Sequence, residues 1–150
     1  ETAREMLAAT EAALPADIAI CAAAVADWRA DTSTNSKLKK DGSGAVPPLS
    51  LVENPDILAT LSAAGPTRPQ LVVGFAAETD DVIDHATAKR VRKGCDWIVA
   101  NDVSPGTGIM GGDNNTVHII TDGAAEHWDP MPKAQVATKL AERVALALTS

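Results

Sequence analysis

Cysteine is scarce in this sequence, and the two cysteines among its 150 residues are Cys21 and Cys95. Their spacing matches neither a disulfide framework nor a zinc site, and His85, His118 and His127 also lack the spacing of metal ligands. The sequence therefore predicts no disulfide-stapled or zinc-dependent fold. Its cysteine usage favours a protein of the reducing cytoplasm.

Long hydrophobic runs are also lacking, because no apolar stretch approaches the ~20 residues that a membrane-spanning helix needs. No signal peptide is visible in the sequence. The formal net charge of −7 disfavours a surface that follows a nucleic-acid backbone, although basic residues cluster at 37–40 and 89–93. We expect no membrane and no nucleic-acid partner, while a local site for a small anion remains open.

A dinucleotide-binding fingerprint is the third absence. No GxGxxG motif occurs, and the clustered glycines at 106, 108, 111 and 112 do not lead from a strand into a helix. The sequence therefore disfavours an NAD(P)-dependent oxidoreductase, although such an enzyme would share the fold class predicted below.

Apolar residues are plentiful, at 45% of the sequence, and the length predicts a single domain over residues 1–150. Unbroken apolar runs predict strands buried on both faces of a parallel sheet, at 17–25, 71–76 and 97–100. Helical spacing and end signals predict helices at 2–14, from Asn54 as N-cap to 63, at 82–94 and after Asp129-Pro130. The predicted fold class is α/β.

Three shorter features complete this assignment. Alternation at 116–121 before Asp122-Gly123 predicts one side of a hairpin. Residues 31–44 lack periodicity and are predicted to form a mobile loop, and 46–52 a short extended piece. Thr2 and Glu5 have the spacing of a capping box, so the first helix starts at once and we expect Glu1 to lie inside a longer protein.

Polar residues follow each of the three apolar strands, at Asp27, at 78–81 and at 101–102. Parallel sheets bind ligands beyond their carboxyl ends, so these positions predict a site there. The small residues at 22–24 and 26 let a ligand approach the backbone, and Lys37, Lys39 and Lys40 can reach an anionic group. The pattern indicates a nucleotide site with a movable basic lid.

Six segments together carry a family resemblance: AAAVADWR at 22–29, KLKK at 37–40, ENPDIL at 53–58, VGFAAET at 73–79, AKRVRKGCDWIVANDV at 88–103 and DNN at 113–115. In this order they resemble phosphopantothenoylcysteine synthetase, and the resemblance covers nearly the whole chain. In bacteria this synthetase is usually the carboxy-terminal half of a bifunctional coenzyme A biosynthesis flavoprotein. The amino-terminal βα units of the family have no counterpart here, so the resemblance implies a partial synthetase domain with an incomplete active site.

The resemblance implies a Rossmann-like three-layer fold with a mostly parallel sheet and a protruding dimerisation arm, over roughly 28–52, in a cytoplasmic homodimer. It implies that CTP, with Mg²⁺, activates 4′-phosphopantothenate to an acyl-cytidylate, which the amine of cysteine then attacks. FMN would belong only to a fused decarboxylase domain of the parent protein.

Residue by residue, the resemblance implies that Lys37 is catalytic and that Asp27 lies by the nucleotide and its cation, holding the metal through water. The full set implied to bind CTP is Ala23, Asp27, Lys37, Pro55, Asp56, Ile57, Leu58, Phe75, Lys89 and Lys93.

Each of these residues also has a purely structural interpretation. A lysine in a polar loop, such as Lys37, is usually only solvated, and Lys89 and Lys93 also suit the last turns of a helix. Asp27 can cap a turn, and Phe75 can be a core residue. At the level of function, the alternatives are a non-catalytic nucleotide-binding or dimerisation module and, less favoured, the oxidoreductase.

Overall fold

The computed structural model describes residues 1–32, 36, 39, 42, 44–46, 48–104, 109 and 111–149. Its strands are β1 (Ile18–Cys21), β2 (Trp28–Ala30), β3 (Leu51–Glu53), β4 (Leu71–Glu78), β5 (Trp97–Asp102), β6 (Asn114–Ile120) and β7 (Glu126–Pro132). Its helices are α1 (Ala3–Ala12), α2 (Ile57–Ser62), α3 (Val82–Lys93) and α4 (Lys133–Leu148), with a 3₁₀ turn at Gly65–Thr67.

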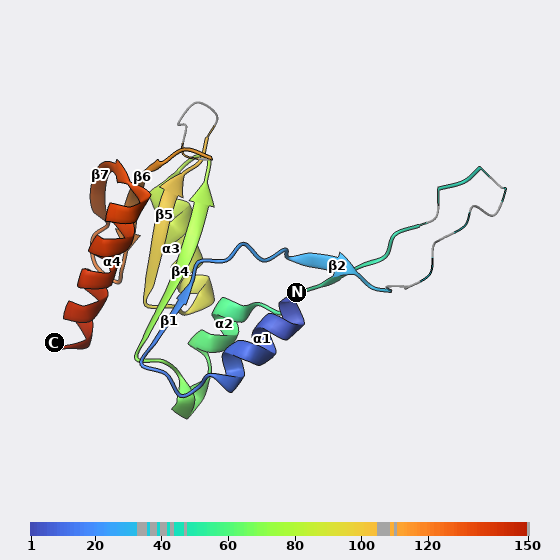
Figure 1. Cartoon of the computed structure of the whole chain (residues 1–150), viewed down its shortest axis with the longest axis horizontal. Coiled ribbons are helices and arrows are strands. Elements are labelled where there is room, and N and C mark those ends of the chain that lie inside the picture. Colours follow the sequence, from blue (N-terminus) through green and yellow to red (C-terminus); the bar gives the residue numbers. More distant parts are fainter. Residues whose placement is uncertain are drawn as a thin grey trace.

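Five strands form one sheet in the order β1-β4-β5-β6-β7. β1, β4 and β5 are parallel, whereas β6 and β7 pair antiparallel as the hairpin that the sequence predicted. β2 and β3 form a separate two-stranded ribbon that projects away from this sheet (Figure 1). The predicted α/β class is confirmed, and the sheet is mixed.

Alternate side chains of the sheet face two different sets of helices. Val73, Val99 and Ile119 pack with Leu140 and Val144 of α4 on one face. On the other face Val72, Ile98 and Ala100 pack with Ala86 of α3, and Leu58 of α2 joins this cluster. The helices thus cover both faces of the sheet, which confirms the three-layer arrangement (Figure 1).

A glycine in β4 determines how closely α2 approaches the sheet. A Cβ atom at Gly74 would lie 2.5 Å from Leu58 Cδ2 and 2.8 Å from Ile98 Cδ1. Carbon atoms pack at about 3.5–4.0 Å, so only glycine leaves room for Leu58 here. The close approach places α2 next to the carboxyl end of β4.

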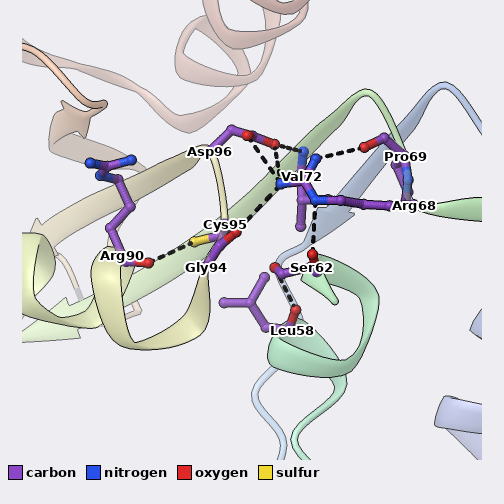
Figure 2. A network of polar contacts seen from close by, with 9 residues as sticks. All are labelled: Leu58, Ser62, Arg68, Pro69, Val72, Arg90, Gly94, Cys95 and Asp96. Carbon is purple, nitrogen blue, oxygen red and sulfur yellow. Dashed lines mark hydrogen bonds and ion pairs between the residues drawn. The ribbon is translucent and has the colours of Figure 1, made fainter. Parts of the chain in front are cut away.

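A polar network secures the opposite end of the sheet, where β4 and β5 begin (Figure 2). Arg68 Nη2 lies 2.9 Å from Asp96 Oδ2, and Arg68 Nε donates to the carbonyl oxygen of Ser62 at 2.8 Å. Asp96 Oδ2 also accepts from the backbone N–H of Val72 at 2.7 Å. One ion pair therefore joins the end of α2 to the first residues of two core strands.

Several helix and strand boundaries differ from the sequence predictions. The predicted strand 17–25 ends at Cys21, so Asp27 lies well beyond the end of β1, while Asn101 and Asp102 lie within β5. The N-cap of α2 is Asp56, not Asn54, because Asp56 Oδ1 accepts from the N–H of Ala59 at 3.0 Å.

The last helix also begins later than predicted. Residues 129–130 belong to β7, and α4 starts only at Lys133. β7 is an edge strand, where the missing N–H of a proline is tolerated. The buried face of α4 carries Val136, Leu140 and Val144.

Candidate functional site

A cavity of about 530 Å³ lies at the carboxyl ends of β1 and β4. Two chain segments supply most of its lining and are called its first and second walls: residues 21–27, from the end of β1 onward, and residues 53–58, from the end of β3 into α2. The remaining lining residues come from α1, β4, α3 and β5: Met6, Phe75, Ala76, Ala77, Lys89, Lys93 and Asn101. This is the edge of the sheet at which parallel strands bind ligands.

The first wall is built from small side chains. Residues 22–27 pair with no strand and are exposed, and four of them are alanines. Their backbone is therefore accessible from the cavity, as a ligand that is recognised through main-chain groups requires. Asp27 is the acidic residue of this wall, and its backbone carbonyl accepts a hydrogen bond from the N–H of Asn54 at 2.7 Å.

The second wall centres on Asp56, which both caps α2 and pairs with Lys93 of α3. Burial raises the pKa of the Asp56 carboxyl, but hydrogen bonds from Lys93 and the Ala59 N–H, with the charges of Lys93 and Arg92, outweigh it. The net effect is a pKa below its ordinary value, so Asp56 is ionised at neutral pH. The Lys93 side chain is 21% exposed, so this ammonium group is held at the cavity edge.

Two lysines of α3 line the same cavity. Lys89 and Lys93 are four residues apart and therefore share one face of the helix. Lys93 has Asp56 as its partner, which balances its charge, and Lys89 adds a second ammonium group to the lining. Such an arrangement suits an anionic group, with the ammonium groups as point charges.

The floor of the cavity is apolar. Phe75 is half-buried, packs against the core cluster between the sheet and α4, and also lines the cavity. Leu58 packs against the other core cluster, and Ile57 is buried. A flat or partly apolar ligand portion can rest on these side chains while its charged portion faces the lysines.

Cys21 also lines the cavity, and the sequence had not assigned it to the site. Burial, and to a smaller extent the charge of Asp56, raises the pKa of its thiol above the ordinary value. The thiol is therefore protonated at neutral pH. Cys95, buried elsewhere in the core, is likewise a free cysteine whose pKa burial raises.

The structure brings the predicted nucleotide-binding residues together. Every one that lies among the described residues lines this cavity: Ala23, Asp27, Pro55, Asp56, Ile57, Leu58, Phe75, Lys89 and Lys93. The predicted catalytic Lys37 lies outside the described residues. The roles of all these residues remain predictions, whereas their convergence is a property of the fold.

The part of the chain that the structure describes contains no group of three or more histidine, cysteine, aspartate or glutamate side chains that could hold a metal ion. Asp27, which the sequence predicts to meet a cation, has an exposed side chain and lines the cavity. In the same described part, no helix is long and apolar enough to cross a membrane.

A second hollow, of about 770 Å³, adjoins the first against the start of α1. Both hollows are lined by Met6, by residues 24–26 and by Asn54. Asn54, which sequence reasoning had placed at a helix cap, therefore lies between them. Its contacts reach residues 25 and 28 positions away along the chain, so no local pattern could have revealed them.

Comparisons with known proteins agree with this architecture. A segment of the chain is 47% identical over 121 residues, 79% of the chain, to "Coenzyme A biosynthesis bifunctional protein CoaBC" of Escherichia coli (strain K12), covering 30% of that protein. The corresponding protein of Haemophilus influenzae is 35% identical over 144 residues, 95% of this chain and 35% of the relative. The chain thus spans about a third of the length of these curated relatives.

Solved structures show the same fold. The crystal structure of the C-terminal domain of CoaBC superposes with a TM-score of 0.75 at 30% identity, covering 99% of this chain and 64% of that one. The DNA/pantothenate metabolism flavoprotein from Streptococcus pneumoniae shares the fold at a TM-score of 0.74 and 20% identity, covering 97% of this chain and 70% of that one. The family model described as "DNA/pantothenate metabolism flavoprotein C-terminal domain" matches residues 1–147, and the chain belongs to this family.

Proposed function

We propose that this chain is the nucleotide-binding part of a CTP-dependent phosphopantothenate–cysteine ligase in coenzyme A biosynthesis. The observation that carries the proposal is the convergence of the predicted nucleotide-binding residues on one cavity at the carboxyl end of the sheet. Membership of the flavoprotein C-terminal domain family and the similarity to CoaBC proteins support the same pathway.

In the proposed reaction, a carboxylate oxygen of 4′-phosphopantothenate attacks the α-phosphorus of CTP, and pyrophosphate leaves. The amine of cysteine then attacks the acyl carbon, the bond to the cytidylate oxygen breaks, and CMP leaves with that oxygen. Lys89 and Lys93 bind the anionic nucleotide, and residues 55–58 lie along it. Lys37 stabilises the charge that develops as the two anions approach each other.

Magnesium would be held mainly by the triphosphate in this proposal. Asp27 is the one carboxylate of the first wall, and its exposure leaves room for water between it and the cation. Such a site fits Mg²⁺, which keeps several waters and commonly takes one or two carboxylates besides substrate phosphates. Magnesium supplies charge neutralisation of the triphosphate when it is bound.

Titration of CTP, ATP and NADPH against the chain in the presence of Mg²⁺ tests the proposal directly. CTP should bind at least tenfold more tightly than ATP, and NADPH should not compete with it. Equal affinity for CTP and ATP would contradict the base selection that we propose. Pyrophosphate release by the full-length gene product then separates a ligase from a module that only binds the nucleotide.

We also propose that the β2–β3 ribbon is a dimerisation arm. It projects from the sheet (Figure 1) and exposes large apolar side chains: Trp28 is 59% exposed and Leu51 is 52% exposed. Unpaired strand edges with apolar side chains favour pairing with a second copy of the chain. Light scattering of the full-length protein should give a dimer mass at tens of micromolar, and a monomer there would contradict the arm's role.

A further inference from the structure

Asn54 is the point at which the two walls of the cavity are joined. Its backbone N–H donates to the carbonyl oxygen of Asp27 at 2.7 Å, and its side-chain Nδ2 donates to the carbonyl oxygen of Ala26 at 2.8 Å. Both acceptors belong to the first wall, while Asn54 itself belongs to the second, residues 53–58. Two hydrogen bonds therefore join the two walls.

Arg29 holds Asn54 in this orientation. Its Nη1 atom lies 3.4 Å from Asn54 Oδ1 and also donates to the carbonyl oxygen of Glu53. Because Asn54 Oδ1 faces Arg29, Asn54 Nδ2 is directed at Ala26. Both the oxygen and the nitrogen of the side-chain amide therefore have a hydrogen-bond partner. Arg29 belongs to β2 and lines the second hollow, not the candidate nucleotide cavity.

The β2–β3 ribbon fixes only one end of the first wall, where Trp28 pairs with Glu53 and the backbone bond from Asn54 to Asp27 follows directly. Residues 22–27 form no strand pairing, and their side chains are exposed. An unpaired segment between β1 and β2 changes its position at low cost unless specific contacts restrain it. Beyond the ribbon, the separation of the two walls therefore depends on the side-chain bond from Asn54 to Ala26.

We propose that Asn54 is a positioning residue for nucleotide binding: it sets the distance between segment 22–27 and segment 55–58, with Arg29 as its support. This inference rests on the proposed function for the identity of the ligand. It does not require Asn54 to contact the ligand, because the residue acts through the wall that it holds.

Nitrogen-15 relaxation of the ligand-free chain tests the positioning step, because it measures the motion of each backbone N–H whether or not that N–H is hydrogen-bonded. Asn54→Ala should lower the backbone order parameters of residues 22–27, while the melting temperature stays within about 3 °C of the unsubstituted chain because no core contact is lost. Gln135→Ala, on the exposed side of α4, removes an amide that does not line the cavity and should leave these order parameters unchanged. Unchanged order parameters at 22–27 in Asn54→Ala overturn the proposal.

CTP titrations of the same variants test the consequence for binding. Asn54→Ala should raise the Kd about five- to tenfold, the scale of one or two lost hydrogen bonds, and Asn54→Asp should do the same because it keeps the acceptor but loses the donor to Ala26. Arg29→Met should raise the Kd as well, although Arg29 does not line the cavity.

The outcomes separate three explanations. If Asn54→Ala weakens CTP binding without changing the order parameters of the ligand-free chain, and Arg29→Met binds normally, Asn54 is a direct ligand contact and positioning is refuted. If the unsubstituted chain binds no CTP, the proposed function fails, while the relaxation measurement still decides whether Asn54 holds the walls. Asn54→Asp provides a second test should the alanine variant fold poorly.

Discussion

Gly74→Ala provides a sharp test of how the site is built, because the added methyl group enters a space that is already filled. Its Cβ would lie 2.5 Å from Leu58 Cδ2, 3.3 Å from Leu58 Cδ1 and 2.8 Å from Ile98 Cδ1. Normal packing needs about 3.5 Å or more, so Leu58 must move by about 1 Å. β4 is paired on both sides, so α2 and Leu58, which also lines the cavity, have to yield.

The expected cost follows from overpacking of a core. Inserting one methyl group into a well-packed interior destabilises by about 1–3 kcal/mol, and each kcal/mol lowers the melting temperature by roughly 2–4 °C in a chain of this length. Urea denaturation followed by circular dichroism measures the free energy of unfolding. Gly123→Ala is the matched control, because the nearest atom to its Cβ is Thr121 Oγ1 at 3.7 Å, and it should change stability by less than about 0.5 kcal/mol.

A double-mutant cycle identifies the clash itself. Leu58→Ala removes both methyl groups that crowd position 74, and Ile98→Val removes the Cδ1 atom. In either background Gly74→Ala should cost less than in the unsubstituted chain, by at least about 1 kcal/mol for Leu58→Ala. Additive effects within about 0.5 kcal/mol in both cycles would show that the reasoning from close approach is wrong.

Asp96→Ala should lower the free energy of unfolding by about 2–3 kcal/mol in the same urea assay, because it leaves the buried N–H of Val72 without its acceptor. Asp96→Asn, which keeps an oxygen acceptor, should lower it less. Stability should fall as the pH is lowered from 7.5 to 5.5, since burial, followed by the charge of His127, lowers the pKa of His118 below 6.5 and the unfolded chain then binds more protons. His118→Gln should flatten this dependence, and an equally steep melting-temperature profile in that variant would contradict it. Lys37→Gln in the full-length protein should lower kcat at least ~100-fold with a smaller change in CTP affinity, whereas equal modest losses in Lys37→Gln and Lys39→Gln would indicate only a diffuse basic loop.

Local signals in the sequence were sufficient for most elements of the fold. The capping box of Thr2 and Glu5 is present at the start of α1, and Gly94 ends α3 in the left-handed conformation with φ +66°. The apolar runs at 71–76 and 97–100 became β4 and β5 at the centre of the sheet. Each of these features depends on contacts within a few residues or on burial of an uninterrupted apolar segment, so a one-dimensional pattern contains them.

Residues of the site could also be predicted from the sequence, through motifs typical of a family. Residues at 23, 27, 55–58, 75, 89 and 93 were singled out on that basis, and they line one cavity. Their spacing alone left each with an ordinary structural interpretation. It was the fold that placed these separate segments around one space, because parallel strands bring their carboxyl ends to the same edge.

Only the tertiary structure decided how the side chains of the site are used. The sequence predicted Asn54 as a helix N-cap, but its side-chain amide is hydrogen-bonded to Ala26 and Arg29, and Asp56 is the N-cap of α2. Asp56 also pairs with Lys93, 37 positions further along the chain. These long-range hydrogen bonds replace the local ones that helix-capping rules predict, because the folded chain brings the distant partners within bonding distance. A contact between residues so far apart leaves no periodicity in the sequence, so it becomes visible only once the chain has folded.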